Sequence, residues 1–330
     1  MLVLLWGVES DPPVAEVHQQ LSLAGIPTTL IDQRRVLETE VDIVVGNKVE
    51  GFVRIGDESI NLAEVTSVYV RPYESVRLAK IAAAGPESAA WRHAARVDDI
   101  LDSWLEVTAA LVVNRCSTMS ANGSKPYQLE QIRSLGWNVP ETLITTDPEA
   151  AREFWNCHGE VVYKSVSGIR SRVSRLRPEH ADRFSDLASC PTQFQQCISG
   201  ADYRVHVVGK EVFACEVQCT ADDYRYAGDE PLEIQACSLT PDLQERCRIL
   251  AAAMNLPVAG IDLRRTPQGE WFCFEVNPSP AFTYYEHTAG QPIAQAVARL
   301  LANGQPGATS GIHNQLCTSG TEDRQHTVVH

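Results

Sequence analysis

Oxygen-bearing side chains gather in residues 260–282, which read as two strands joined by a turn at residues 266–269. Because side chains alternate between the two faces of a strand, the expected register puts Asp262, Glu275 and Asn277 on one face. Two carboxylates and an amide are hard oxygen ligands, the set that suits Mg²⁺ carried by nucleotide phosphates. An ordinary edge hairpin with one solvated face is the alternative interpretation, so other segments have to decide between the two.

The register expected for this hairpin pairs Arg265 with Glu270 and Asp262 with Cys273, which places Cys273 on the polar face. A slip of one residue would turn the carboxylates into the core, so the separation of polar from apolar side chains supports this register. The apolar face then consists of Ile261, Leu263, Phe272, Phe274 and Val276.

A lysine near the exit of a strand marks a second candidate site. Residues 160–165 read as a strand that carries Lys164, and the small polar loop after it includes Ser165, Ser167 and Gly168. Loop amides together with an ammonium group favour a bound polyanion such as the phosphates of a nucleotide. An exposed strand lysine is the plainer interpretation of Lys164 alone. The Gly-x-x-x-x-Gly-Lys pattern of a P-loop is absent from the sequence.

The composition describes an ordinary globular protein with room for two or three subdomains. The chain has 330 residues, of which 44% are hydrophobic and 21% charged. Its 28 basic and 42 acidic side chains give a formal charge of −14, which argues against a nucleic-acid partner because like charges repel. The 10 cysteines show no paired framework and indicate reduced thiols.

No membrane association is expected. A run of about 18 apolar residues, as a transmembrane helix needs, does not occur in the sequence. Residues 1–7 lack the basic start and the length of a signal peptide and read as a buried strand. These observations lead us to expect a cytoplasmic protein.

The first 114 residues read as a small α/β unit. A strand-helix-strand start is followed by short strands, by a strand at residues 65–71 and by a long amphipathic helix at residues 85–107. A Gly-x-Gly-x-x-Gly turn is absent, so an ordinary dinucleotide-binding fold is not supported. The Ser- and Asn-rich residues 114–125 read as a crossing between subdomains.

The rest of the chain up to about residue 301 mixes helices with many strands. A loop with Asp223, Tyr224 and Arg225 interrupts it, and residues 304–330, which lack periodicity, are expected to be a disordered tail. Strands are predicted at residues 141–145, 160–165, 172–176, 192–198, 202–208 and 211–217, and helices at 126–135, 148–157, 241–254 and 293–301.

The order of these features resembles the ATP-grasp superfamily, and within it the RimK-like ligases and the related enzymes that crosslink ribosomal peptides. The resemblance covers about residues 120–303, and residues 1–114 are similar to the α/β domain that precedes the grasp in those enzymes. Joint spacing carries the resemblance, since no single motif is specific. Its elements are Lys125, Lys164, the hinge Gln195-Gln196-Cys197-Ile198, Asp202, Arg204, Asp262, Glu275 and Asn277.

The resemblance implies an α/β (α+β) fold in which a nucleotide lies between two antiparallel-sheet subdomains. The implied domains are an N-terminal pre-ATP-grasp domain (1–114), a small or lid subdomain (115–198), a C-terminal subdomain with the metal site (199–303) and the tail (304–330).

The resemblance also implies how ATP would be held. The two lysines would bind its phosphates, and the backbone of the hinge residues Gln196 to Ile198 would meet the adenine. Gln196 stands where relatives often have an acidic residue that binds the ribose, which puts that contact in doubt. The implied ATP-binding set is Lys125, Lys164, Ser165, Gly168, Gln196, Cys197, Ile198 and Asp202.

By the same resemblance, Asp262, Glu275 and Asn277 would coordinate Mg²⁺, with Mn²⁺ as an alternative ion. Arg204 and Lys164 would be the catalytic cations, with Arg204 beside the transferred phosphoryl group or the bound carboxylate. Such transfer depends mainly on positioning and charge neutralisation. An amine, or less often a hydroxyl, would then attack the acyl phosphate.

Substrate contacts are less well defined. Arg71 and Arg225 are candidates because guanidinium pairs bidentately with carboxylate, and a surface ion pair is the alternative for each. Ser279 lies in the exit Asn277-Pro278-Ser279-Pro280, which departs from the usual glycine-containing continuation and indicates a changed substrate wall. Tyr284 could line the same pocket or belong to a helix-entry loop.

The sequence thus predicts a ligase that joins the carboxylate of an amino acid or short peptide to an amine and yields an amide, ADP and phosphate. A macrocyclase that forms side-chain esters or amides in a ribosomal peptide is the first alternative, and a silent nucleotide-binding regulatory module is the second. A homodimer is left open.

Overall fold

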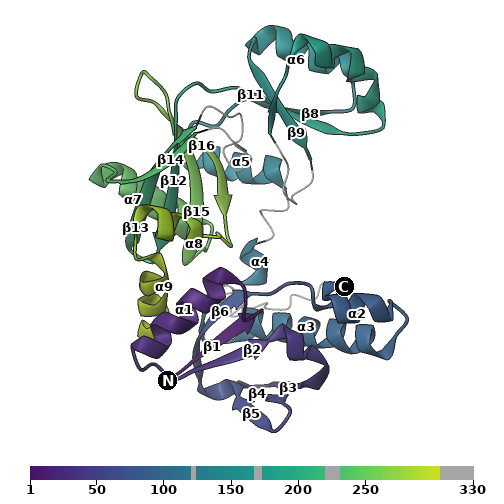
Figure 1. Ribbon diagram of the computed structural model, residues 1–330, viewed down its shortest axis with the longest axis vertical. Coiled ribbons are helices and arrows are strands. Elements are labelled where there is room, and N and C mark those ends of the chain that lie inside the picture. The colour runs from purple at the N-terminus through teal and green to yellow at the C-terminus, as the bar shows by residue number, and fades with distance from the viewer. Residues whose placement is uncertain (120–123, 167–172, 220–230, 305–330) are drawn as a thin grey trace, which may run out of the picture.

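The computed structural model describes residues 1–119, 124–166, 173–219 and 231–304. Ser167, Gly168, Arg225 and residues 305–330 of the expected tail lie outside these ranges. Within the described part, the strands form four sheets, and Figure 1 shows them arranged as an arch with the first 114 residues at one end. No helix of the described part is both long and apolar enough to cross a membrane.

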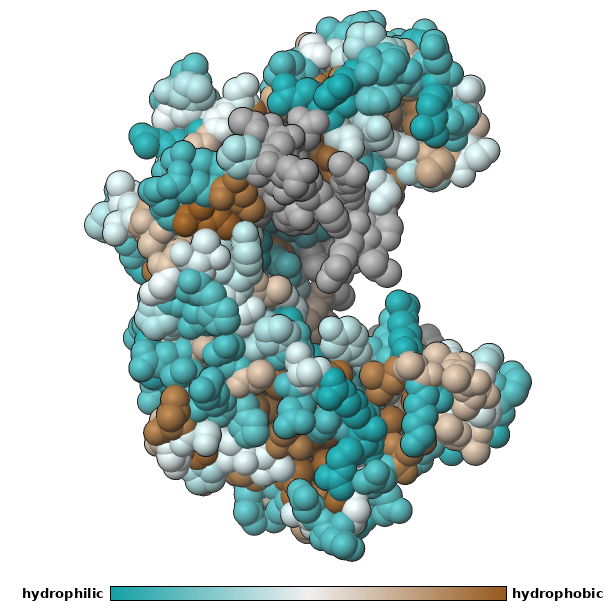
Figure 2. Space-filling model, viewed as in Figure 1, coloured by the Kyte–Doolittle hydropathy of each residue, from teal (hydrophilic) through white to brown (hydrophobic). Residues whose placement is uncertain are grey.

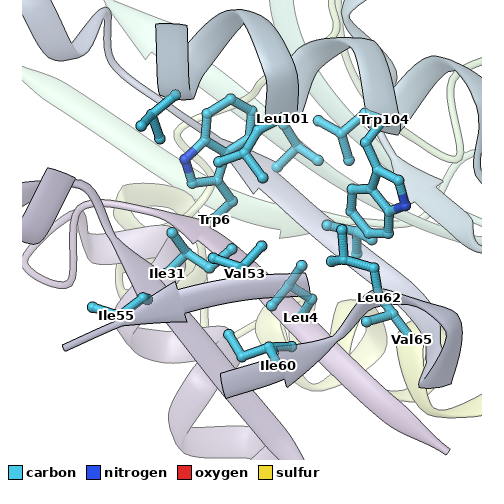
Figure 3. Packing of buried hydrophobic residues seen from close by; sticks show 14 of the residues in the cluster. Leu4, Trp6, Ile31, Val53, Ile55, Ile60, Leu62, Val65, Leu101 and Trp104 are labelled. Atoms are coloured by element: carbon cyan, nitrogen blue, oxygen red, sulfur yellow. The ribbon is translucent and has the colours of Figure 1, made fainter. Parts of the chain in front are cut away.

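The first sheet is parallel, with strand order β2-β1-β6-β7. Its strands are nearly continuous apolar runs, and successive side chains point to opposite faces, so one face is buried against α3 and the other against α1 and α9. Figure 3 shows Trp6 of β1 and Trp104 of α3 in the first of these two cores. The elements are β1 (Leu2–Gly7), α1 (Pro12–Leu23), β2 (Thr28–Asp32), β6 (Val65–Arg71), α3 (Ala89–Val107) and β7 (Leu111–Val113).

A three-stranded antiparallel sheet, β3-β4-β5, extends the same core at the far end of the arch. The helix expected at residues 85–107 begins only at Ala89, because the Ser88 hydroxyl accepts a 3.1 Å hydrogen bond from Trp91 N and caps it. The elements are β3 (Thr39–Val45), β4 (Val49–Ile55), β5 (Glu58–Asn61), α2 (Ala79–Ala84) and the short 3₁₀ turns Gln33–Glu38, Leu62–Glu64 and Ser75–Arg77.

The lid at the other end of the arch is an antiparallel sheet of order β10-β9-β11-β8. Helix α6 covers one face through a small core of its own that includes Val161, Phe184 and Phe194. The 3₁₀ segment at Pro178–Ala188 was not predicted. The elements are β8 (Thr142–Thr145), α6 (Pro148–His158), β9 (Val161–Ser165), β10 (Ser174–Arg175) and β11 (Thr192–Gln196), preceded by α4 (Cys116–Met119) and α5 (Lys125–Ser134).

The central sheet is antiparallel, with order β14-β13-β12-β15-β16. Helices α5 and α7 pack on one side of it, and α8 covers part of the other. Figure 2 shows the viewed face hollowed between the lid above and the region of α2 and α3 below. The elements are β12 (Ala201–Val208), β13 (Glu211–Cys219), β14 (Leu232–Cys237), α7 (Pro241–Ala253), β15 (Val258–Arg265), β16 (Trp271–Asn277), α8 (Thr283–Ala289) and α9 (Ile293–Asn303).

The β15-β16 hairpin corrects the register expected from the sequence. Asp262 pairs with Glu275 instead of Cys273, and Leu263 pairs with Cys273, so Phe274 is the extra residue of a β-bulge. Because the bulge shifts the alternation by one residue, Cys273 is fully buried in the core. The prediction that Cys273 shares the polar face was therefore wrong.

The predicted apolar face of the hairpin also needs correction. Ile261, Leu263 and Val276 are buried as expected, but Phe272 and Phe274 are half-buried. Phe272 pairs with Arg264, and the guanidinium of Arg264 lies 5.2 Å from the centre of the Phe274 ring. The bulge thus keeps the carboxylates out of the core and leaves two aromatic rings beside them.

Candidate active site

A buried arginine and a carboxylate form the centre of the candidate site. Arg204 of β12 lies directly opposite Asp262 of β15, and its Nη1 donates to Asp262 Oδ1 at 2.6 Å. The Arg204 side chain is 7% exposed, whereas that of Asp262 is 32% exposed. The ion pair therefore has its cation inside the sheet surface and its carboxylate turned toward solvent.

Three neighbours fix the Arg204 guanidinium. Arg204 Nε donates to His206 Nε2 at 3.4 Å, and the guanidinium carbon lies 5.6 Å from the centre of the Tyr285 ring. Gly260 supplies the space for the head group, because a Cβ there would come within 2.8 Å of the guanidinium carbon. His206 thus contacts the arginine directly.

His206 is fully buried, and its Nδ1 has no hydrogen-bond partner within the described part of the chain. Burial, and then the positive charge of Arg204, lower the pKa of His206 well below its ordinary value. A neutral imidazole can accept from Arg204 Nε, whereas an imidazolium could not. The imidazole is therefore held in the form that accepts this hydrogen bond.

Lys125 reaches the second carboxylate from the first turn of α5. Its Nζ forms an ion pair with Glu275 Oε1, with side-chain exposures of 14% and 22%. Burial raises the pKa of Glu275, but the cations Lys125, Lys164 and Arg204 outweigh it, so the net effect is a lowered pKa. Glu275 therefore pairs with Lys125, and its pKa also responds to the charges of Lys164 and Arg204.

Gln128 anchors α5 to the edge strand that carries Glu275. Its Nε2 donates to Val276 O at 2.8 Å, and its Oε1 accepts from Val276 N at 3.0 Å. Gln128 lies one helical turn after Lys125, so the same face of α5 carries both side chains. The backbone hydrogen-bonding groups of Val276 on the edge strand are thereby satisfied. The same contact holds Lys125 beside Glu275.

The predicted metal ligands lie close together. Asp262 and Glu275 are a cross-strand pair, and Asn277 follows on β16 opposite Gly260. Asn277 Oδ1 accepts a 3.0 Å hydrogen bond from Ser279 N, which fixes its side chain at the strand exit. No cluster of three or more acidic, His or Cys side chains able to hold a metal occurs among the described residues, so this set would need phosphate oxygens to complete a coordination shell.

At the hinge, the backbone is tied on both sides. The N–H groups of Gln196 and Cys197 donate to Glu141 O and Glu160 O, each at 2.9 Å. Ile198 O accepts from Arg264 Nη1 at 2.8 Å. The three residues predicted to meet the adenine are therefore held in place by the lid and by the central sheet.

Asp202, predicted to bind ATP, forms a two-pronged pair with Arg264. Nε and Nη2 of the arginine donate to its Oδ1 and Oδ2 at 2.7 and 2.8 Å. Burial lowers the pKa of Arg264, but the bonds and charge of Asp202 outweigh that effect and raise it. Arg264 is accordingly a fixed cation between the hinge residues 195–198 and the β15-β16 hairpin.

The remaining residues predicted to contact the nucleotide belong to the lid. Lys164 and Ser165 lie at the end of β9, opposite Gln193 and Thr192 of β11. The positive charge of Lys164 contributes to the lowered pKa of Glu275. Gly168, which was expected in this loop, lies outside the described residues.

The residues predicted to bind the substrate differ in burial and in their contacts. Arg71 donates from Nε to Asp11 Oδ2 at 2.6 Å and from Nη1 to Ser279 Oγ at 2.8 Å, and both ends of the ion pair are nearly buried. Tyr284 lies on α8 and is 52% exposed. Arg225 is outside the described part of the chain. Substrate binding by these residues stays a prediction.

Sequence reasoning missed three residues that shape the site: Gln128, Arg264 and Asn114. Each acts through backbone groups of a distant segment, and a single sequence carries no signal for such a partner. Asn114 Nδ2 donates to Val258 O at 2.6 Å and also to Pro278 O, which fixes the exit of the hairpin to the first sheet.

The chain is similar to known ATP-grasp proteins in sequence and in fold. Residues 135–301 match a family model described as a RimK-like ATP-grasp domain. A ribosomal protein bS6–L-glutamate ligase of Escherichia coli O81 (strain ED1a) is 36% identical over 207 residues, which cover 59% of this chain and 69% of the relative. A probable alpha-L-glutamate ligase of Ectopseudomonas mendocina (strain ymp) is 32% identical over 216 residues, 62% of this chain and 71% of the relative.

Two solved structures resemble nearly the whole chain. The ATP-grasp ligase PsnB, complexed with a variant of a minimal precursor, Mg and ADP, is 26% identical with a TM-score of 0.77 and matches 92% of this chain and 98% of its own. The macrocyclase MdnC from Microcystis aeruginosa MRC, bound with the precursor peptide MdnA, has a TM-score of 0.78 at 23% identity and matches 92% of this chain and 100% of its own. The ATP-grasp fold with a preceding α/β domain, expected from the sequence, is thereby confirmed.

Proposed function

The chain belongs to the RimK-like ATP-grasp family, and on that premise we propose that it joins a carboxylate to an amine at the expense of ATP. The substrates are an amino acid or a short peptide, and the products are an amide, ADP and phosphate. The observation that carries the proposal is the cross-strand pair of carboxylates Asp262 and Glu275, which form ion pairs with the cations Arg204 and Lys125. Such a cluster of cations and carboxylates suits phosphoryl transfer, which depends on positioning and charge.

Asp262, Glu275 and Asn277 fit Mg²⁺ in chemistry, because all three offer oxygen ligands from one hairpin. Bound there, Mg²⁺ would neutralise negative charge on the ATP phosphates. The cations Arg204 and Lys125, which pair with the two carboxylates, balance their charge in the described structure. The domain bounds 1–114, 115–198 and 199–303 are part of the proposal, and the sheet content of the three segments supports them.

The protein's own residues position the reactants. Lys125 and Lys164 hold the phosphates, and Arg204 stabilises the charge of the γ-phosphoryl group as it moves to the substrate carboxylate. The resulting acyl phosphate is a good electrophile. An amine attacks its carbonyl carbon, the amide bond forms, and phosphate leaves with the carboxylate oxygen. No protein nucleophile takes part in this sequence.

Phosphate release over paired amino acids and dipeptides tests the proposal, with mass detection of products one water lighter than the sum of the pair. ADP and phosphate are expected only when both substrates are present. Glu275→Gln and Lys164→Ala should each lower turnover at least 100-fold, because each removes a charged side chain proposed to act at the γ-phosphoryl group. Undiminished product formation by either variant would contradict the assignment of that residue.

A ribosomal-peptide ligase that forms side-chain esters or amides is a second candidate, and one observation favours it. The two solved structures that match 92% of the chain, its N-terminal α/β domain included, are a ligase and a macrocyclase bound to precursor peptides. A peptide with alternating acidic and Thr, Ser or Lys residues is the discriminating substrate. Loss of one water per crosslink without a second substrate would establish this candidate over the first.

A further inference from the structure

The segment that joins the lid to the central sheet passes over a single guanidinium. Strand β11 ends at Gln196 and β12 begins at Ala201, and Arg264 lies beneath the residues between them. Its side chain is 23% exposed and rests on the ring of Phe274, the extra residue of the β-bulge. The bulge thus supplies the surface on which this guanidinium lies.

All three nitrogens of the Arg264 head group are engaged. Nη1 holds the Ile198 carbonyl at 2.8 Å, while Nε and Nη2 hold both oxygens of Asp202 at 2.7 and 2.8 Å. Such a fork fixes direction as well as distance, which a lysine could not do. Ile198 and Asp202 are thereby fixed relative to β15, the strand that carries Asp262.

Arg264 determines how the N–H group of Ile198 is oriented in the hinge. The N–H groups of Gln196 and Cys197 are committed to lid carbonyls, and no hydrogen bond is found for the N–H of Ile198 within the described part of the chain. With its carbonyl pinned by Arg264, the Ile198 peptide has a set orientation. Its N–H remains as the hinge donor that can meet a ring nitrogen of the base.

We infer that Arg264 is a positioning residue for the nucleotide base and that Asp202 acts through Arg264 rather than through the ribose. This inference rests on the proposed use of ATP. It assigns Asp202 differently from the direct contact that the sequence predicts. Arg264 contacts no reacting atom, so its loss should weaken nucleotide binding and leave the chemical step nearly unchanged.

Direct binding of ADP with Mg²⁺, measured by calorimetry on the full chain, is the first test. Arg264→Lys keeps the charge but loses the fork, and about tenfold weaker binding is expected, together with a smaller preference for ADP over GDP. Arg265→Lys is the matched control on the neighbouring, exposed arginine and should bind as wild type. Wild-type affinity and base preference in Arg264→Lys would overturn the inference.

Asp202→Asn separates the two roles of the carboxylate. If Asp202 acts through Arg264, the variant should weaken ADP and 2′-deoxy-ADP equally, and the double variant should be no worse than either single one. A loss seen with ADP alone and additive to Arg264→Lys would show a direct ribose contact and refute the inference. Thermal unfolding of each variant confirms that the fold is intact.

Turnover measured alongside gives a second, independent readout. In Arg264→Lys, KM for ATP should rise by about the same factor as the ADP dissociation constant, while kcat at saturating ATP stays within about twofold of wild type. A loss confined to kcat would contradict a positioning role at the base. If wild type itself fails to bind ADP or ATP, the proposed function fails, which is a different outcome from any change between variants.

Discussion

At the scale of single residues, Arg204 is the group whose surroundings are most closely specified. A carboxylate, an imidazole and an aromatic ring contact it, and Gly260 leaves space for it. A charge held this rigidly needs no reorganisation when negative charge develops beside it, which is the condition for electrostatic stabilisation of a transition state. The guanidinium shape should therefore matter as much as the charge.

Arg204→Lys tests that expectation. We expect kcat to fall about 100-fold or more, because an ammonium cannot keep the bonds to Asp262 and His206 together. Steady-state turnover with ATP and both substrates gives kcat, and calorimetry gives the ADP affinity, which should change little. Arg299→Lys, at the exposed pair with Glu211, is the control and should be indistinguishable from wild type. Equal kcat in both variants would exclude a catalytic role for Arg204.

His206 leads to a prediction about pH. Its pKa in the folded protein is well below 6.5, so the unfolded chain takes up the proton first as the pH falls. Its contribution to stability is therefore full above about pH 6.5 and is lost as the pH drops below it. His206→Gln keeps an acceptor for Arg204 without a titrating group.

The measurement is the free energy of urea unfolding at pH 8 and at pH 5 for both proteins. Wild type should lose about 1–2 kcal/mol more than His206→Gln over this range. The other histidines contribute equally to both and cancel in the difference. Parallel pH profiles of the two proteins would mean that His206 is protonated as easily in the folded state as in the unfolded chain.

At this scale the sequence identified the side chains whose charge is unusual for the apolar strands in which they lie. Asp262 and Glu275 were found because two carboxylates at alternating positions of apolar strands require an explanation. Gln128 and Arg264 were not found, because a glutamine on a helix and an arginine on a strand are ordinary until their partners are known. Those partners are the backbone of Val276 and of Ile198, 148 and 66 residues away.

At the scale of elements, a glycine in β15 leaves the space that the Arg204 side chain of β12 occupies. Gly260 lies opposite His206, and Arg204 bends over it toward the exit of β16. Alternation of apolar residues predicted both strands within a residue or two. The bulge in β15-β16 could not be predicted, because nothing in the sequence distinguishes Phe274 as an inserted residue from Phe274 as a core residue.

Gly260→Ala follows from that geometry. The new methyl group would meet the guanidinium carbon of Arg204 and Pro280 Cβ at 2.8 Å, so the arginine has to move. We expect at least a tenfold loss of kcat with a stability loss of about 1–3 kcal/mol, as for other overpacked sites. Gly46→Ala, where the nearest atom would be 4.0 Å away, is the control for both assays. A fully active Gly260→Ala protein would show that catalysis does not depend on the position of the Arg204 guanidinium.

At the scale of the whole molecule, the α/β unit at the start of the chain and the central sheet share one core. Val3 and Leu5 of the first sheet, α1, α9 and Val258 of β15 belong to the same buried cluster. The lid, by contrast, has a small core of its own. Domain boundaries read from the sequence mark changes in composition, and a single sequence does not show that α9 returns to pack on α1.

Asn114 is the polar counterpart of that shared core. It follows β7 of the first sheet and is 2% exposed. Its amide nitrogen donates to the carbonyls of Val258 and Pro278, and its oxygen accepts from Val258 N at 3.3 Å. One side chain therefore links the first sheet to the start of β15 and to the residue that follows β16.

Replacement of Asn114 should consequently destabilise the molecule as a unit. In Asn114→Ala, buried backbone groups lose their partner, and a cost of about 2–4 kcal/mol in the free energy of unfolding is expected. Asn114→Asp should cost at least as much, because a carboxylate would face two carbonyl oxygens. Asn303→Ala, at the exposed end of α9, is the control and should change stability by less than about 0.5 kcal/mol.

Urea unfolding makes the measurement, followed by fluorescence in variants that keep only Trp104, for the first sheet, or only Trp137, for the core of the central sheet. Because the two regions share a core, both signals should shift to lower urea together in Asn114→Ala. Separate transitions, with only the first sheet destabilised, would show that the regions unfold independently. In that case the site hairpin would keep its geometry without Asn114, and the nucleotide affinity of the variant would equal that of wild type.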